Sequence, residues 1–98
     1  MTVAMAALAF FLPHKAVVQS TAYCSSGTMA NGRFTHVGAV AMNMLPLGKR
    51  VSVNRSPTGL RFHRVEDRIG WGSQLDFYVP SCSRARAWGR RYVTVRWR

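Results

Sequence analysis

The chain has 98 residues, 48% of them hydrophobic, and it carries 14 Lys and Arg against 3 Asp and Glu, a formal net charge of +11 at pH 7. This length accommodates one small domain and excludes a multidomain protein. The positive charge predicts an anionic partner, such as nucleic acid, anionic lipid or an acidic cell envelope. Because the basic residues are spread along the chain and form no RNA-binding motif with the aromatic residues, we do not expect nucleic acid to be that partner.

The chain begins with an apolar run from Val3 to Leu12, which Pro13 ends. The run is too short to span a bilayer. Its length and small residues are typical of the hydrophobic region of a secretory signal, and the stretch up to Ser20 offers an acceptable cleavage point, although the usual preceding basic residues are missing. We interpret residues 1–20 as a degenerate or truncated export signal. A membrane anchor, a helix packed on the domain and a true start further upstream are the alternatives.

Short strands separated by turns dominate the rest of the chain. Apolar and β-branched residues predict six strands, at residues 16–23, 37–44, 49–54, 60–66, 74–79 and 91–97. The third and fourth should form a hairpin, with Leu60, Phe62, His63 and Val65 near the core. We also assign Phe77 and two tryptophans, Trp88 and Trp97, to the core.

One short helix is expected between the last two strands. Ser81 is a suitable N-cap, and Gly89 suits the C-terminal cap after Trp88. Six short strands, many turns and one short helix predict a mainly β fold, in the form of a small β-barrel.

All three carboxylates lie in one stretch. Glu66, Asp67 and Asp76 are the only acids, and the last two bracket a loop that contains Trp71 between two glycines. Asp76 lies in an apolar run, where an unpaired charge costs several kcal/mol to bury, so the side chain must be paired, face a cleft or be protonated. This arrangement predicts a site in which Asp76 can donate a proton.

Structural roles are the alternative for each acid. Glu66, Asp67 and Arg68 could form an ion-pair cluster at a strand end. A guanidinium beside Asp67 would keep that carboxylate ionised, which makes Asp67 a structural partner rather than the donor. Asp76 could accept backbone amides and only stabilise a loop.

The two cysteines, Cys24 and Cys82, could form a disulfide or stay as two buried thiols. A bridge would close a long loop and stabilise the fold by about 4 kcal/mol on the chain-entropy estimate, and it would imply an oxidising compartment. The cysteines and the scattered His14, His36 and His63 lack metal-ligand spacing, so we expect no metal site.

Five segments follow one another along residues 21–98. They are Thr21-Ala22-Tyr23-Cys24, Ala39-Val40-Ala41 with Leu45-Pro46-Leu47-Gly48-Lys49-Arg50-Val51, Glu66-Asp67-Arg68-Ile69-Gly70, Leu75-Asp76-Phe77-Tyr78, and Pro80-Ser81-Cys82 through Ala87-Trp88-Gly89-Arg90-Arg91 to Val93-Thr94-Val95. In this order they resemble the three-aspartate domain, a double-psi β-barrel of membrane-bound lytic transglycosylases of the A type and of small secreted cell-wall proteins. Rare lipoprotein A carries a related barrel.

The resemblance implies a six-stranded double-psi barrel in which Asp76 is the catalytic acid and Asp67 its partner. The family's first aspartate is absent, since Ala41, Met42 or Asn43 stands at that place. The loop between the two remaining aspartates is also shorter than in the family.

The implied function is cleavage of the glycosidic bond between muramic acid and glucosamine in peptidoglycan, without water and without a cofactor. A single acid suffices, because Asp76 can protonate the leaving oxygen and then accept the proton of the sugar's own 6-hydroxyl. The expected location is the periplasm or cell wall, with weak attraction to the anionic envelope. The alternative is a barrel that binds peptidoglycan and does not cut it. Expected substrate contacts are stacking on Trp71 and Tyr78 and polar contacts from Asn43, Ser73 and Gln74. For the two aromatic residues, packing in the core or at its rim is the alternative.

Overall fold

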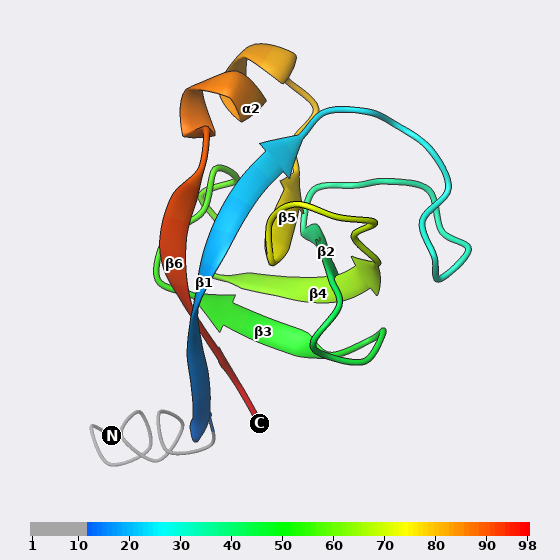
Figure 1. Cartoon of the computed structure of the whole chain (residues 1–98). Helices are drawn as coiled ribbons and strands as arrows, with labels where there is room; N and C mark the ends of the chain where they lie inside the picture. Colours follow the sequence, from blue (N-terminus) through cyan, green and yellow to red (C-terminus); the bar gives the residue numbers. More distant parts are fainter. Residues whose placement is uncertain (1–11) are drawn as a thin grey trace, which may run out of the picture.

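A computed structural model describes residues 12–98 of the chain. In this part of the protein, six strands form a closed barrel and one short helix lies at one end of it (Figure 1). The sequence-based expectation of a small, mainly β barrel with six strands and one short helix is confirmed. The elements are β1 (His14–Tyr23), β2 (Ala39–Met42), β3 (Arg50–Val53), β4 (Phe62–Asp67), β5 (Leu75–Tyr78), α2 (Cys82–Trp88) and β6 (Arg91–Trp97).

The order of strands around the barrel is β1-β5-β2-β4-β3-β6, and β6 pairs again with β1. Two pairs are parallel, β1 with β5 and β2 with β4, and the other four are antiparallel. The expected hairpin is the antiparallel pair β3 and β4. Parallel pairs bring together segments that lie far apart in the sequence, and β1 and β5 contribute the candidate site described below.

The barrel begins earlier than the boundary predicted at residue 21. Strand β1 starts at His14, and its residues up to Ser20 pair with β6. Cleavage after Ser20 would therefore remove the β1 side of that pairing. Nearly all of the apolar run that was interpreted as an export signal lies outside the described residues.

Inward-facing apolar side chains of all six strands fill the barrel. Phe77 and Trp88 are buried as predicted, and Trp97 packs partly against the core. Leu60 and Phe62 were wrongly assigned to the core, because they are 45% and 41% exposed. The reason is the phase of β4, which points His63 and Val65 inward and so turns the neighbouring Phe62 outward. The other core residues include Val18, Val40, Met42, Val51, Val53, Leu75, Val93 and Val95.

The helix α2 has the two caps that the sequence predicts. The Ser81 hydroxyl accepts a hydrogen bond from the Arg84 amide, and Gly89, with a positive φ of 63°, donates its amide to the Ala85 carbonyl. Trp88 anchors the helix to β1 by donating its indole N–H to the Ser20 hydroxyl at 3.1 Å.

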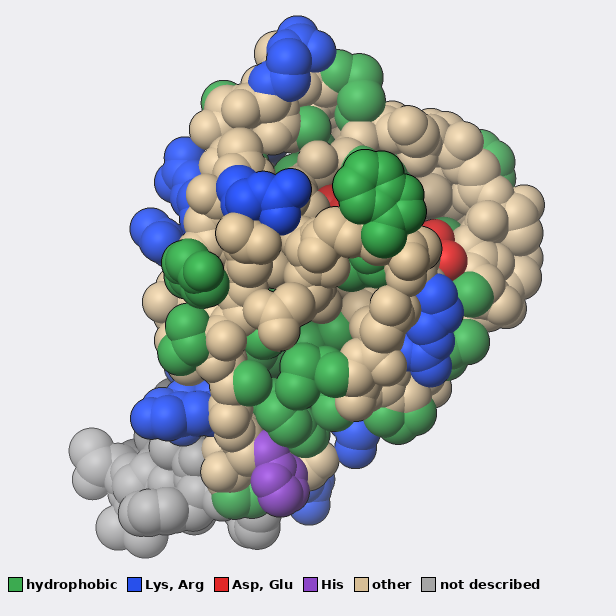
Figure 2. All heavy atoms as spheres, viewed as in Figure 1, with side chains coloured by type: hydrophobic (Ala, Val, Ile, Leu, Met, Phe, Trp, Pro, Cys, Tyr) green, Lys and Arg blue, Asp and Glu red, His purple; other side chains and the backbone are tan. Residues whose placement is uncertain are grey.

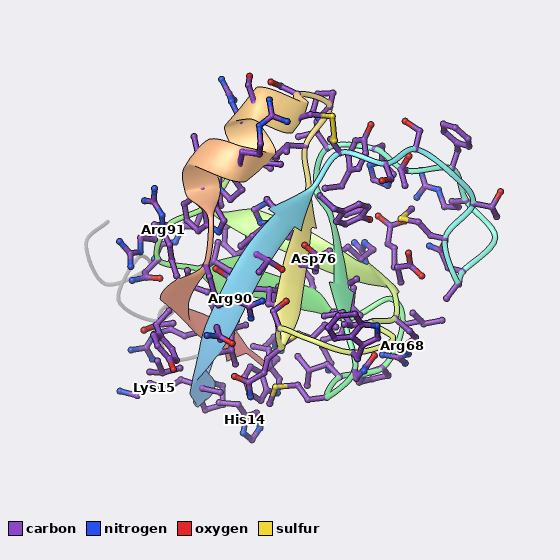
Figure 3. The ribbon with its side chains drawn as sticks, turned by 45° about the horizontal axis from the view of Figure 1, so that its top comes forward. His14, Lys15, Arg68, Asp76, Arg90 and Arg91 are labelled. Atoms are coloured by element: carbon purple, nitrogen blue, oxygen red, sulfur yellow. A yellow bond between two sulfur atoms is a disulfide. The ribbon has the colours of Figure 1, made fainter. Side chains whose placement is uncertain are left out.

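A disulfide between Cys24 and Cys82 connects the end of β1 to the start of α2, so the bridged alternative is the one that the structure contains. The sulfur bond is visible near the top of Figure 3. It lies at the start of the long connection between β1 and β2, which extends out to one side of the barrel and returns to β2 (Figure 1). The Ala30 amide of this connection donates to Asp67, so the connection borders the candidate site.

Candidate functional site

The barrel places both aspartates in one row across four strands. Thr21 on β1 is opposite Asp76 on β5, Asp76 is opposite Ala41 on β2, and Ala41 is opposite Asp67 on β4. Residues opposite one another in a regular sheet have side chains on the same face, and for Thr21, Asp76 and Ala41 this face is the outer one, because the neighbour of Asp76, Phe77, points into the core. The register between β2 and β4 shifts between Val40 and Ala41, so an irregularity in the pairing, and not plain alternation from Val65, brings Asp67 opposite Ala41. Figure 3 shows Asp76 on β5, close to β1.

Asp76 is half-buried, and its Oδ1 accepts a hydrogen bond from the Thr21 hydroxyl at 3.0 Å. The hydroxyls of Thr21 and Ser73 are in turn 2.6 Å apart. Burial raises the pKa of the Asp76 carboxyl above its ordinary value, the Thr21 hydrogen bond opposes the shift, and the charge of Asp67 adds to it. Asp76 thus holds its proton more strongly than an ordinary aspartate does.

Asp67 stabilises the backbone at the end of β4. Its Oδ1 accepts the amides of Ala30 at 2.9 Å and of Arg68 at 2.8 Å. The Arg68 guanidinium does not lie on Asp67. It donates from Nη1 to the carbonyls of Met42 and Leu45, both at 2.6 Å, so the proposed cluster of Glu66, Asp67 and Arg68 does not form. Figure 3 shows Arg68 away from Asp76.

Glu66 is the carboxylate that forms ion pairs. It is 1% exposed, and its oxygens lie 3.4 Å from Arg33 Nη1 and 2.6 Å from His36 Nε2. Asn31 donates its side-chain amide to the same carboxylate at 2.9 Å. The ion-pair alternative therefore holds for Glu66, with partners from the connection between β1 and β2.

The two aspartates differ from Glu66 in this respect. Within residues 12–98, no Lys, Arg or His forms an ion pair with Asp67 or Asp76, although the chain has a net charge of +11. Figure 2 shows the acidic atoms as small red areas on one face, with separate blue groups of Lys and Arg around them. The barrel thus holds two aspartates without counter-ions in a strongly basic protein.

Tyr23 also belongs to this site, and the sequence analysis did not single it out. Its hydroxyl is buried and has no hydrogen-bond partner among the described residues. Burial raises its pKa, and the charges of Asp67 and Asp76 add to the shift. The available signal was the alternation along β1, which places Tyr23 on the same face as Thr21.

The two predicted stacking residues have opposite surroundings. Trp71 is 92% exposed at the loop between β4 and β5, so its ring is free to meet a ligand. Tyr78 is only 7% exposed and packs edge-on against Tyr23 with ring centres 5.5 Å apart. The prediction that Tyr78 stacks on a sugar is incompatible with this burial.

Three predicted polar contacts lie together. Asn43, Ser73 and Gln74 line a small cavity of about 160 Å³, and Ser73 connects it through Thr21 to Asp76. Asn43 exchanges two hydrogen bonds with the backbone of Ile69, at 2.7 and 2.9 Å, and so connects the ends of β2 and β4. The Gln74 side-chain carbonyl accepts a hydrogen bond from the Gln19 backbone N–H. The Gln74 backbone N–H donates to the Gln19 backbone carbonyl.

Comparison of the chain with protein-family models, with curated proteins and with solved structures gives no match. In the part of the chain that the structure describes, no helix has the length and apolar character needed to cross a membrane. The same residues contain no group of three or more His, Cys, Asp or Glu side chains placed to hold a metal ion.

Proposed function

We propose that the protein is a peptidoglycan lytic transglycosylase with Asp76 as its acid and base. The observation that carries the proposal is the environment of the Asp76 side chain. Asp76 is half-buried, has a raised pKa and has no cationic partner in residues 12–98. A general acid must hold its proton near the working pH, and these surroundings favour that form. The resemblance of residues 21–98 to the three-aspartate domain supports the same assignment.

The reaction needs one proton transfer from Asp76 to the glycan and one from the glycan back to Asp76. Asp76 donates its proton to the glycosidic oxygen, the bond from that oxygen to C1 of muramic acid breaks, and the glucosamine leaves with a hydroxyl group. The 6-hydroxyl oxygen of the muramic acid then bonds to C1, and its proton passes to the Asp76 carboxylate. No water is consumed, the acid returns to its first state, and the product is a 1,6-anhydro sugar.

The other residues of the site hold Asp76 and contact the glycan. Thr21 orients Asp76 through its 3.0 Å hydrogen bond, and Asp67 favours the protonated form by like-charge repulsion. The exposed Trp71 offers a flat apolar surface to a sugar ring. Asn43, Ser73 and Gln74 supply polar groups at the neighbouring cavity.

The test is product analysis after incubation with purified peptidoglycan. The native protein should release muropeptides with 1,6-anhydro ends, detected by mass spectrometry. Asp76→Asn should abolish release and keep the fold, since an amide of the same shape can still accept from Thr21. Equal release by Asp76→Asn would remove Asp76 from the reaction. Trp71→Ala should leave the product unchanged and weaken retention on the wall.

A second candidate function is a barrel that binds peptidoglycan and does not cut it. The observation that favours it is Ala41, which lies between the two aspartates in the row across the sheet and brings no polar group. A binder would be retained on insoluble wall, would release no soluble product, and would bind equally well as Asp76→Asn.

The location and barrel type belong to the same proposal. The Cys24–Cys82 disulfide supports an oxidising compartment, hence the periplasm or cell wall, where peptidoglycan is present. The two parallel strand pairs within a six-stranded barrel support a double-psi topology. A disulfide found reduced in the protein isolated from cells would contradict the location.

A further inference from the structure

We propose that a basic groove beside the aspartates binds the carboxylates of the peptide stem that muramic acid carries in peptidoglycan. The groove has a volume of about 220 Å³, and its charged lining comes from three elements of the fold. The proposal rests on the proposed function, because it takes peptidoglycan as the ligand. We define the basic groove by the residues Arg33, His36, Arg50, Phe62, Arg64 and Glu66.

The arginines of the basic groove outnumber its acid. Arg50 on β3 and Arg64 on β4 are directly opposite each other, so their side chains lie on one outer face of the sheet. Arg33 reaches the groove from the connection between β1 and β2. The only carboxylate is Glu66, which is buried and already paired with Arg33 and His36. The groove therefore has an excess of positive charge that nothing in residues 12–98 neutralises.

Each arginine is held by one contact and keeps further donors available. The Arg50 guanidinium lies 4.2 Å from the centre of the Phe62 ring. Arg64 donates from Nη1 to the Gly48 carbonyl at 2.7 Å, and Arg33 Nη1 lies 3.4 Å from the Glu66 carboxylate. A guanidinium has five N–H donors, so several remain available for bidentate hydrogen bonding to a carboxylate. Holding the side chains in advance lowers the entropy lost on binding.

The position of the basic groove suits a substituent of the glycan. Arg64 and Asp67 are three residues apart on β4, which is roughly 10 Å along a strand. Asp76 lies two strands away from β4 on the same outer face. An extended peptide covers about 3.5 Å per residue. Two strand spacings add about 10 Å across the sheet, so the Cα atoms of Arg64 and Asp76 are roughly 12–14 Å apart. A stem that leaves a muramic acid at Asp76 covers about 7–10 Å by its second or third residue, where its free carboxylates lie, and the extended Arg64 side chain spans the remainder.

The test is an NMR titration with a synthetic stem, N-acetyl-L-alanyl-γ-D-glutamyl-L-lysine, which needs no cleavage for its readout. The peptide should shift the side-chain Nε–Hε signals of Arg33, Arg50 and Arg64. Its diamide, which lacks both carboxylates, should bind at least roughly tenfold more weakly, since charge-assisted hydrogen bonds are lost. Inorganic phosphate at the same concentration should cause smaller shifts.

Matched variants distinguish binding at the basic groove from non-specific attraction to the net positive charge of the protein. Arg64→Gln and Arg50→Gln should each weaken binding of the peptide roughly fivefold to tenfold, which corresponds to one charged contact. Arg90→Gln removes the same charge just before β6, where Arg90 donates to the Gln19 side chain on β1 and does not line the basic groove, and should bind as the native protein does. Urea unfolding of each variant verifies that the barrel is intact.

Three outcomes would overturn the proposal: equal weakening by Arg90→Gln, equal affinity for the diamide, or shifts by phosphate as large as those by the peptide. The result is separate from the test of catalysis. Binding of the stem by a protein whose Asp76→Asn variant still releases product would refute the catalytic assignment and leave the groove standing. Anhydro products without stem binding would refute the groove alone.

Discussion

At the scale of single residues, the surroundings of Asp76 shift its protonation equilibrium toward the neutral form. The folded protein raises the pKa of this carboxyl through burial and the nearby Asp67. An aspartate with a raised pKa binds more protons folded than unfolded, so its contribution to stability decreases as pH rises through the shifted range. The half-buried Asp76 carboxylate is in this way a source of instability at neutral pH.

This linkage gives a prediction for Asp76→Asn. The variant should melt at a higher temperature than the native protein at pH 7, because a neutral amide replaces a half-buried carboxylate. The two melting temperatures should converge at a pH where Asp76 is protonated. Thermal unfolding followed by circular dichroism at both pH values measures this. A variant less stable at pH 7 would show that the carboxylate stabilises the fold.

His63 gives a second prediction at this scale. It is buried against Phe77, its Nε2 lies 2.8 Å from the Thr58 hydroxyl, and burial lowers its pKa to about 4. Between that value and about 6.5 the unfolded chain binds a proton that the folded chain does not, so stability falls as pH decreases through this window. The loss at pH 4 should be on the order of 2 kcal/mol.

Urea unfolding at pH 7 and pH 4.5 tests this assignment. His63→Gln should show a smaller difference between the two pH values than the native protein, whatever its absolute stability. His14→Gln, at the exposed start of β1, is the matched control and should behave as the native protein does. An unchanged difference in His63→Gln would assign the pH dependence to other groups.

The sequence revealed those site residues whose role is visible in their immediate sequence neighbourhood, and it missed those whose role depends on distant segments. Asp67 and Asp76 stood out because acids are rare in this chain and both flank one loop. For Tyr78 the sequence left stacking and packing as alternatives, because its burial depends on tertiary contacts such as the one between its hydroxyl and Ser26. Tyr23 was missed for the same reason, since its closeness to both aspartates arises only when β1 pairs with β5.

At the scale of elements, the Cys24–Cys82 disulfide holds the connection between β1 and β2 beside the site. The bridge spans 58 residues, so the chain-entropy estimate gives about 4 kcal/mol of stabilisation. This connection also supplies the Ala30 amide to Asp67 and both ion-pair partners of Glu66. Loss of the bridge should therefore affect the site as well as stability.

A double variant, Cys24→Ser with Cys82→Ser, tests both effects. The free energy of unfolding should fall by about 4 kcal/mol or less, since the denatured chain regains conformational freedom. Hydrogen exchange of the Ala30 amide should become faster at the same time. Unchanged stability would contradict the entropic role, and unchanged exchange would show that the connection is held by its other contacts.

The positions of helices and strands were easier to predict than which of their side chains point into the core. The helix α2 and strand β6 match the predicted caps and bounds, because capping residues and alternation are local signals. Phe62 of strand β4 was wrongly predicted to point inward. Apolar or aromatic side chains occupy both alternating sets of positions near the start of this strand, so the sequence did not show which set faces the core. The structure resolves the phase by burying His63 and Val65.

At the scale of the whole molecule, the class of fold could be predicted and the arrangement of the site could not. Short strands, turns and one helix indicate a β-barrel from local patterns alone. The order β1-β5-β2-β4-β3-β6 depends on contacts between distant segments. That order places Ala41 between the aspartates and brings Arg50 opposite Arg64, and no motif in the sequence encodes either neighbour pair.

The central claim is that this barrel cleaves a glycan by internal transfer, with Asp76 carrying the proton. The most direct measurement is mass spectrometry of the products formed in water labelled with heavy oxygen. The account predicts anhydro muropeptides that contain no labelled oxygen, and none at all from Asp76→Asn. Products with labelled reducing ends would show hydrolysis instead, and the absence of any product from the folded native protein would contradict catalysis.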